Sequence, residues 1–126
     1  MKGIWVSSIL FLMITVGMFF TQYMLEEHSD KMIDMLTQAT DLVKKEKWNE
    51  AFGKTEEIEI GWEKDSKWIS MLVNHNETEE ILKTVYAMKE YVRYREVPEL
   101  MATAATLKGL FEHIPAKERP SLENIF

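Results

Sequence analysis

The residues of this sequence best suited to metal binding or acid–base chemistry are its three histidines, His28, His75 and His113. They fall in three separate segments, and only His75 has a carboxylate at helical spacing, Glu79 four residues further on. We expect a helix to begin near Asn76, which would take His75 off the face that carries Glu79. Because zinc needs three or four converging ligands and a supporting second shell, the sequence predicts no metal site. We expect His75 to be a turn or cap residue bonded to backbone.

Motifs for nucleophilic catalysis or cofactor binding are absent from the sequence. It has no cysteine, which excludes disulfides, thiolate metal sites and a lipidated cysteine. Its five glycines are isolated and form neither a phosphate-cradling loop nor a dinucleotide fingerprint. Carboxylates such as Glu56, Glu57 and Glu59 fall at helix-surface positions, where acid–base catalysis cannot be distinguished from solubility. We therefore predict no catalytic residue, no cofactor and no enzymatic activity.

The most informative element is an uncharged N-terminal segment, residues 3–25. At about 1.5 Å of rise per residue, a helix over its strongly apolar part, residues 4–20, covers roughly 25 Å, and the whole segment covers roughly 34 Å. A hydrocarbon core is about 30 Å thick, so one pass fits. Trp5 and Tyr23 lie near the two ends, where amphipathic rings favour the headgroup level. We predict a single-pass transmembrane helix over residues 3–25.

Two other interpretations of this segment stay open, a cleaved secretory signal and a long buried helix. A signal is cleaved at a small-x-small site after about 7 to 15 apolar residues. Here the apolar run is longer, and it leads into residues 18–23 (MFFTQY), which offer no such site. The sequence therefore favours an uncleaved anchor.

Basic residues beside the segment indicate its orientation in a membrane. Lys2 and the amino terminus lie on one side, whereas residues 26–35 on the other side are rich in acidic groups and have Lys31 as their only lysine or arginine. Short cytoplasmic tails are enriched in lysine and arginine. We expect a protein of the cell membrane with its N-terminus in the cytoplasm and residues 26–126 as an extracytoplasmic domain.

The charge balance argues against one class of partner. The chain has 21 Asp and Glu against 15 Lys and Arg, a net charge of −6, and every acidic residue follows the uncharged segment. The basic cluster of Lys44, Lys45 and Lys47 is interrupted by Glu46, as expected of a solvated helix end. Binding of a phosphate backbone needs concentrated cationic surface, so we predict no nucleic-acid partner.

Apolar residues recur at helical spacing through residues 26–126, and no segment alternates with period two. The pattern predicts helices over residues 29–47, 48–74 and about 77–95, and a fourth that has Pro98 in its first turn and ends at Pro115. The second helix has possible breaks at Gly61 and at residues 65–66, and residues 74–76 are expected to form a turn. The fold class is therefore all-α, with the transmembrane helix continuing as a stalk into an antiparallel bundle of three to four helices.

Two groups of apolar residues are candidates for binding a partner. At about 100° per residue, Trp48, Trp62 and Ile69 share a helix face, whereas Trp68 points nearly 120° away from Trp62. Protein interfaces are enriched in tryptophan, so Trp68 is one candidate. Ile125 and Phe126 at the end of the chain are the other, because they can dock on the bundle or be presented to a partner. The alternative is that the tryptophans are core residues whose N–H groups bond to backbone or water.

The chain also resembles a known family through its aromatic residues and its tail. The features are the one-pass N-terminus, Trp48 with Ala51, the pair Trp62 and Trp68, His75 before a helix, and the terminal residues 121–126 (SLENIF). In these it resembles the bacterial family called domain of unknown function 4363, over nearly its full length. The resemblance implies a membrane-associated helical protein, chiefly of spore-forming Gram-positive bacteria, and it implies no activity.

Two classes of function agree with these observations. The first is a membrane-tethered interaction or accessory module, whose helical domain docks on another membrane or envelope protein, which can be a multi-pass one. The second is a small-ligand sensor, a bundle with a pocket lined by Met, Tyr and Trp that acts through an associated membrane protein. Self-association of the chain stays open in both. We favour the interaction module.

Overall fold

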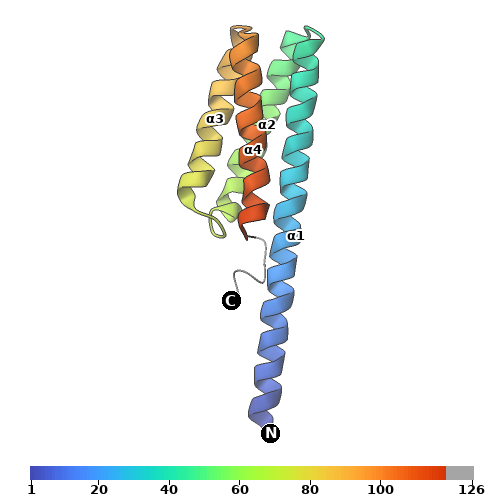
Figure 1. Ribbon diagram of the computed structural model, residues 1–126, viewed down its shortest axis with the longest axis vertical. Coiled ribbons are helices and arrows are strands. Elements are labelled where there is room, and N and C mark those ends of the chain that lie inside the picture. Colours follow the sequence, from blue (N-terminus) through green and yellow to red (C-terminus); the bar gives the residue numbers. More distant parts are fainter. Residues whose placement is uncertain (119–126) are drawn as a thin grey trace.

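The computed structural model describes residues 1–118, and the candidate residues Ile125 and Phe126 lie outside them. Over the described residues the chain is helical, with no strand, which confirms the all-α prediction. Helix α1 packs against α2 and α4, and α3 packs against the same two, so the four helices form an antiparallel bundle with short connections (Figure 1). The helices are α1 (Lys2–Lys44), α2 (Trp48–Ile69), α3 (His75–Arg93) and α4 (Val97–Glu118).

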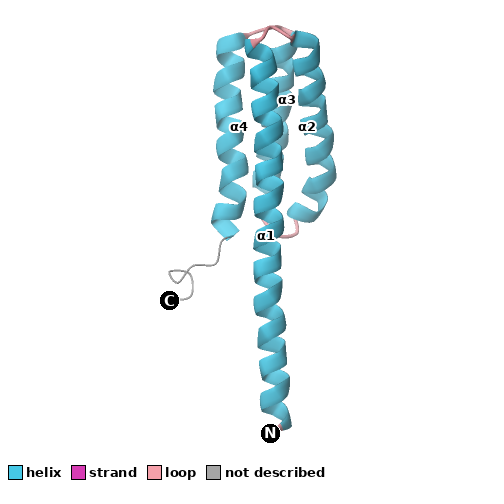
Figure 2. Cartoon of the chain, turned by 90° about the vertical axis from the view of Figure 1, so that its right-hand side faces the viewer, coloured by secondary structure: helices cyan, strands magenta, loops and turns pink. Residues whose placement is uncertain are grey.

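Helix α1 is one continuous helix that extends far beyond the bundle at its N-terminal end (Figure 2). Its buried residues begin at Gln22, and it has neither glycine nor proline between Gly17 and its end. The projecting part is long enough and apolar enough to cross a membrane, and none of it is buried. The structure thus confirms that the apolar segment continues into the bundle without a break.

The core consists of one apolar stripe from each helix, as helical periodicity requires. The apolar periodicity of α3 and α4 predicts one inward stripe on each, and the buried residues follow it, with Leu82 only partly buried and Tyr86 exposed. The stripes are Ile81, Val85, Met88 and Val92 on α3, and Leu100, Ala104, Leu107, Phe111 and Ile114 on α4. Trp62 and Phe111 are the largest fully buried side chains and meet edge to face with ring centroids 5.8 Å apart. The remaining fully buried large side chains are Leu25, Met32, Ile58, Ile69, Ile81, Met88, Leu100, Leu107, Ile114 and Val85.

The boundaries of α2 and α3 differ from those predicted. Helix α2 runs unbroken through Gly61 and through residues 65–66, and it ends at Ile69, five residues before the predicted end at Asn74. The Asn74 side chain accepts a hydrogen bond from the Asn76 N–H at 2.9 Å, which caps α3 and starts it at His75. The expected turn over residues 74–76 is therefore a helix start.

The two connections at the far end of the bundle share one geometry. Glu46 follows α1 and Arg95 follows α3, and both adopt left-handed backbone angles, with φ of 60° and 55°. In each, the N–H of the next residue bonds to the carbonyl five residues back, Lys47 to Leu42 and Glu96 to Tyr91, both at 2.9 Å. This is the Schellman arrangement, which closes a helix by satisfying its last carbonyls.

The prediction that Pro115 ends the fourth helix is wrong, because α4 continues through it to Glu118. Proline has no N–H, so the Phe111 carbonyl one turn earlier loses its helical donor. The Ser29 hydroxyl of α1 donates to that carbonyl oxygen at 2.7 Å, and Gln22 Nε2 donates to the carbonyl oxygen of Pro115 at 2.8 Å. Side chains of α1 therefore supply the donors that this end of α4 needs.

We expect Ser29→Ala to destabilise the bundle by about 1–3 kcal/mol, since it leaves a buried carbonyl oxygen without a donor. The measurement is urea unfolding of the full chain in detergent micelles, followed by tryptophan fluorescence. In a Pro115→Ala background, residue 115 regains an N–H for Phe111, so the same substitution should cost clearly less. Thr37→Ala is the matched control, because Thr37 is exposed and bonds within its own helix. Equal costs for Ser29→Ala in the two backgrounds would contradict the explanation.

Candidate functional site at the base of the bundle

The end of the bundle from which α1 projects, here called the base, contains a buried polar and aromatic cluster. The base cluster consists of His28 from α1 and Trp62, Asp65 and Trp68 from α2. The His28 ring lies 5.6 Å from the Trp62 ring and 5.9 Å from the Trp68 ring, centroid to centroid. The Trp62 indole N–H donates to the Thr78 carbonyl oxygen at 3.1 Å, which ties α2 to the first turn of α3. The cluster thus joins three helices.

His28 is the titratable group at the centre of the cluster, and its side chain is only 5% exposed. Its Nδ1 lies 3.0 Å from Asp65 Oδ2, so a neutral imidazole donates its Nδ1–H to the carboxylate. Burial lowers the pKa of His28, the Asp65 charge opposes this, and Lys31 adds to the lowering. The Nε2 atom is buried with no hydrogen-bond partner among residues 1–118. His28 is therefore a neutral histidine oriented by one carboxylate.

The tertiary structure brings all three histidines to the base and places a carboxylate beside each one. His75 Nε2 lies 2.9 Å from Glu79 Oε1, so the expectation that these residues occupy different faces is wrong: the helix starts at His75. His113 Nε2 lies 3.8 Å from Glu77 Oε1, between α4 and α3. The three pairs stay separate, and residues 1–118 hold no group of three His, Cys, Asp or Glu side chains placed to share a metal ion.

Trp68, the candidate binding residue that the structure describes, is half-buried. Its ring packs edge-on against His28, and part of it stays open to solvent. Beside it an open groove between α1 and α2 is lined by Met24, Glu27, His28, Lys31 and Asp65. Trp48 lies at the opposite end of the bundle, with the Arg95 guanidinium 5.6 Å from its ring centroid. Trp68 and this groove are therefore the exposed part of the base cluster.

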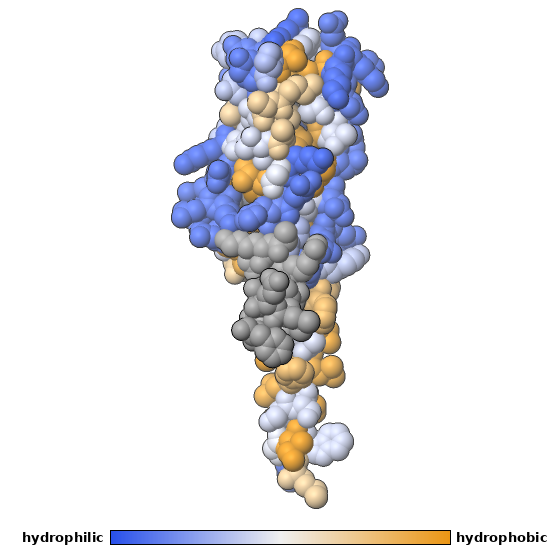
Figure 3. All heavy atoms as spheres, in the orientation of Figure 1, coloured by the Kyte–Doolittle hydropathy of each residue, from blue (hydrophilic) through white to orange (hydrophobic). Residues whose placement is uncertain are grey.

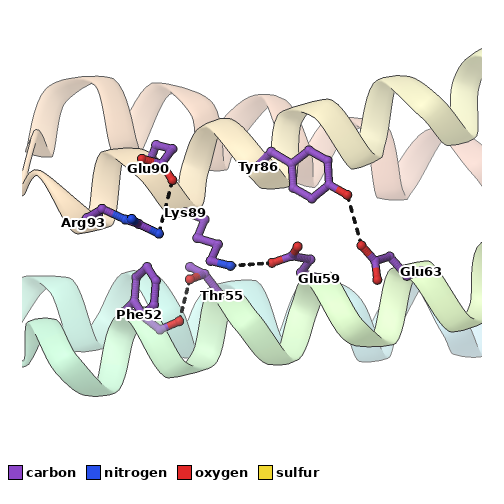
Figure 4. A network of polar contacts seen from close by, with 8 residues as sticks. All are labelled: Phe52, Thr55, Glu59, Glu63, Tyr86, Lys89, Glu90 and Arg93. Carbon is purple, nitrogen blue, oxygen red and sulfur yellow. Dashed lines mark hydrogen bonds and ion pairs between the residues drawn. The ribbon is translucent and has the colours of Figure 1, made fainter.

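Two carboxylates of α2 bridge to α3: Glu59, which its spacing predicts to lie on the helix surface, and Glu63 (Figure 4). Lys89 Nζ donates to Glu59 Oε2 at 2.9 Å, and the Tyr86 hydroxyl donates to Glu63 Oε1 at 3.1 Å. The hydrogen bond to Glu59 raises the pKa of Lys89. Lys89 and Arg93 also lie over the Phe52 ring, 5.5 and 5.4 Å from its centroid. The spacing within α2 could not reveal these contacts, because both partners lie on another helix.

Comparison with known proteins gives one match. The model of a family described as Domain of unknown function (DUF4363) matches residues 19–125. The match begins within α1, at the end of the apolar part, and takes in the whole bundle. No curated protein and no solved structure matches the chain.

We expect the stability of the bundle to fall as the pH is lowered from about 6.5, the ordinary pKa of histidine. Because burial lowers the pKa of His28 in the folded state, the unfolded chain binds more protons between that lowered pKa and about 6.5. One such group changes the free energy of unfolding by at most about 1.4 kcal/mol per pH unit, and the loss levels off below the folded pKa. Urea unfolding of the full chain between about pH 5.5 and 7.5 measures this slope.

His28→Gln should reduce this pH dependence, and His75→Gln, at a side chain that is 72% exposed, is the matched control. An NMR titration gives the ring pKa of His28 directly. A value at or above about 6.5, the ordinary pKa of histidine, would contradict the prediction.

Proposed function

This chain belongs to the DUF4363 family, a domain of unknown function, and we propose that it is a membrane-tethered interaction module whose helical domain docks on another membrane or envelope protein. In this proposal residues 3–25 cross the membrane once and are not cleaved. The bundle is the part that binds, and the base cluster with its open groove is the surface nearest the membrane.

The observation that carries the proposal is the continuity of α1 from the apolar segment into the bundle. A bundle held on a loop could turn freely, whereas a continuous helix holds it at one height and limits its orientation relative to the anchor. The surface changes accordingly, from the apolar projecting helix to the hydrophilic bundle (Figure 3). A partner in the same membrane would therefore approach the base of the bundle in nearly one orientation. Less rotational freedom is then lost on binding, which favours specific docking.

The packing of the interior supports an interaction module over a small-ligand sensor. Trp62, Phe111 and Met32 lie between the helices and are almost fully buried. A sensor of the expected kind needs a pocket between the helices lined by such side chains. Trp62 and Phe111 instead meet edge to face in the interior, and the base groove opens on the surface.

We propose the orientation that the positive-inside rule favours, with the N-terminus in the cytoplasm and the bundle outside. Because the chain has no native cysteine, single substitutions report their own accessibility. Lys45→Cys, on the exposed turn after α1, should react with a membrane-impermeant maleimide on intact cells. Ala39→Cys, at a fully buried position of the same helix, is the control and should not react until the chain is unfolded. Labelling of residue 45 only after the membrane is opened would mean that the bundle faces the cytoplasm.

A photo-crosslinking residue at position 67, next to Trp68, should capture one membrane protein in near-equal amount in intact cells. The same residue at position 83, an exposed lysine of α3 away from α1, is the matched control and should capture it far less. The products are identified by mass spectrometry after affinity purification from detergent. Recovery of the bait alone from position 67 would contradict the proposed docking surface.

Trp68→Ala should reduce recovery of that partner about tenfold or more, a loss of about 1.4 kcal/mol, as expected of a tryptophan that anchors an interface. Trp68→Phe, which keeps an aromatic ring against His28, separates loss of the partner from loss of the base cluster. Unfolding curves of both variants show whether the bundle itself has changed. Undiminished recovery with Trp68→Ala would mean that Trp68 is a packing residue only.

A further inference from the structure

We propose that the turn between α2 and α3 inserts into the lipid interface beside the anchor, with Met71 and Leu72 as the side chains that enter the bilayer. The inference rests on the proposed membrane span and adds a second contact with the membrane. The partner of this turn is thus lipid, whereas the surface proposed above for protein docking is Trp68 with its groove.

The exposure of the turn is the first observation. Residues 70–74 connect the helices, and the side chains of Met71 and Leu72 stand out from them, 85% and 40% exposed. Turns usually carry glycine, asparagine, aspartate or serine, because these residues suit solvent and tight backbone geometry. Single exposed apolar residues are common on proteins, so exposure alone does not indicate contact with lipid. The height of Met71 and Leu72 relative to the apolar segment is the stronger observation.

The position follows from the register between α1 and α2. Asp65 contacts His28, and four residues earlier Gly61 lies opposite Met32, whose Sδ is 4.0 Å from the position a Cβ on Gly61 would take. The helices are antiparallel, so this register brings Met71 about level with Gln22, inside the uncharged segment 3–25. Figures 1 and 2 agree, since the turn lies level with the point where α1 leaves the bundle. If residues 3–25 cross the membrane, the turn reaches the height of the interface.

The neighbours at that height suit a lipid interface. Tyr23 is exposed on α1, and tyrosine is a residue type that favours the headgroup level of membranes. Lys67 is exposed one turn before Met71, where a long side chain can cover apolar surface and keep its ammonium near lipid phosphates. Asn74 ends the turn as the polar cap of α3, which limits insertion to the interface and keeps the helix ends out of the hydrocarbon.

Site-directed labelling in bilayers tests the depth of the turn. Met71→Cys, carrying an environment-sensitive fluorophore, is prepared in the full chain and reconstituted in phosphatidylcholine nanodiscs with or without lipids that bear a quencher near the headgroup. Phe11→Cys, in the middle of the apolar segment, reports on the anchor. Lys45→Cys, at the far end of the bundle, is the solvent-exposed control. We expect a blue-shifted emission and lipid-dependent quenching at residue 71, and neither at residue 45.

The other outcomes distinguish failure of the lipid contact at the turn from failure of the proposed membrane span. If the label at residue 11 lies in lipid but residue 71 behaves like residue 45, the turn stays in water and only this inference fails. If residue 71 is blue-shifted without quenching by lipid, a second copy of the chain covers it, and the lipid contact is again wrong. If residue 11 also stays in water, the proposed membrane span fails together with the inference.

Discussion

The seam between α1 and α4 at the base is the constraint on which the rest of this structure depends. A proline inside a helix leaves a carbonyl without its donor, and a buried carbonyl without a partner costs free energy. Ser29 removes that cost at Phe111, and Gln22 bonds to Pro115 itself. Because both donors belong to one helix and lie two turns apart, they fix the height of α4 against α1. Phe111 of α4 then packs against Trp62. Because His28 of α1 lies beside the same indole, α1 and α4 both contact this one buried ring.

Around that indole the base is built differently from the rest of the core. Elsewhere the helices meet mainly through aliphatic side chains, whereas here a histidine paired with a carboxylate contacts two tryptophans. Burial keeps His28 neutral against the attraction of Asp65, because the cost of desolvating an imidazolium exceeds what one carboxylate returns. Directional contacts of this kind fix a specific arrangement, since a hydrogen bond or a ring contact is lost when helices slide, whereas aliphatic contacts can be exchanged.

The polar contacts of α2 with α3 and the closed turns at the far end hold the remaining helices together. The connection of the bundle to the apolar segment is the continuous helix α1, so no flexible linker separates the two. The proposed docking at the base and the proposed contact of the Met71 turn with lipid both use this property. Each places a defined surface at a defined height above a membrane, and a flexible linker would remove the advantage of either.

The sequence by itself determined the features that depend on local pattern. The apolar segment, the helical class of the domain and the inward faces of α3 and α4 follow from composition and from a period of 3.6 residues, which reports burial on one helix at a time. Only the tertiary structure decided how the helices are matched in height. Because of this match, Ser29 of α1 reaches the carbonyl that Pro115 leaves without a donor, and Glu59 pairs with Lys89. It also brings three histidines from distant segments to one end of the bundle. Periodicity is unchanged when one helix slides along another, so contacts that depend on this offset cannot be predicted from the pattern of a single helix.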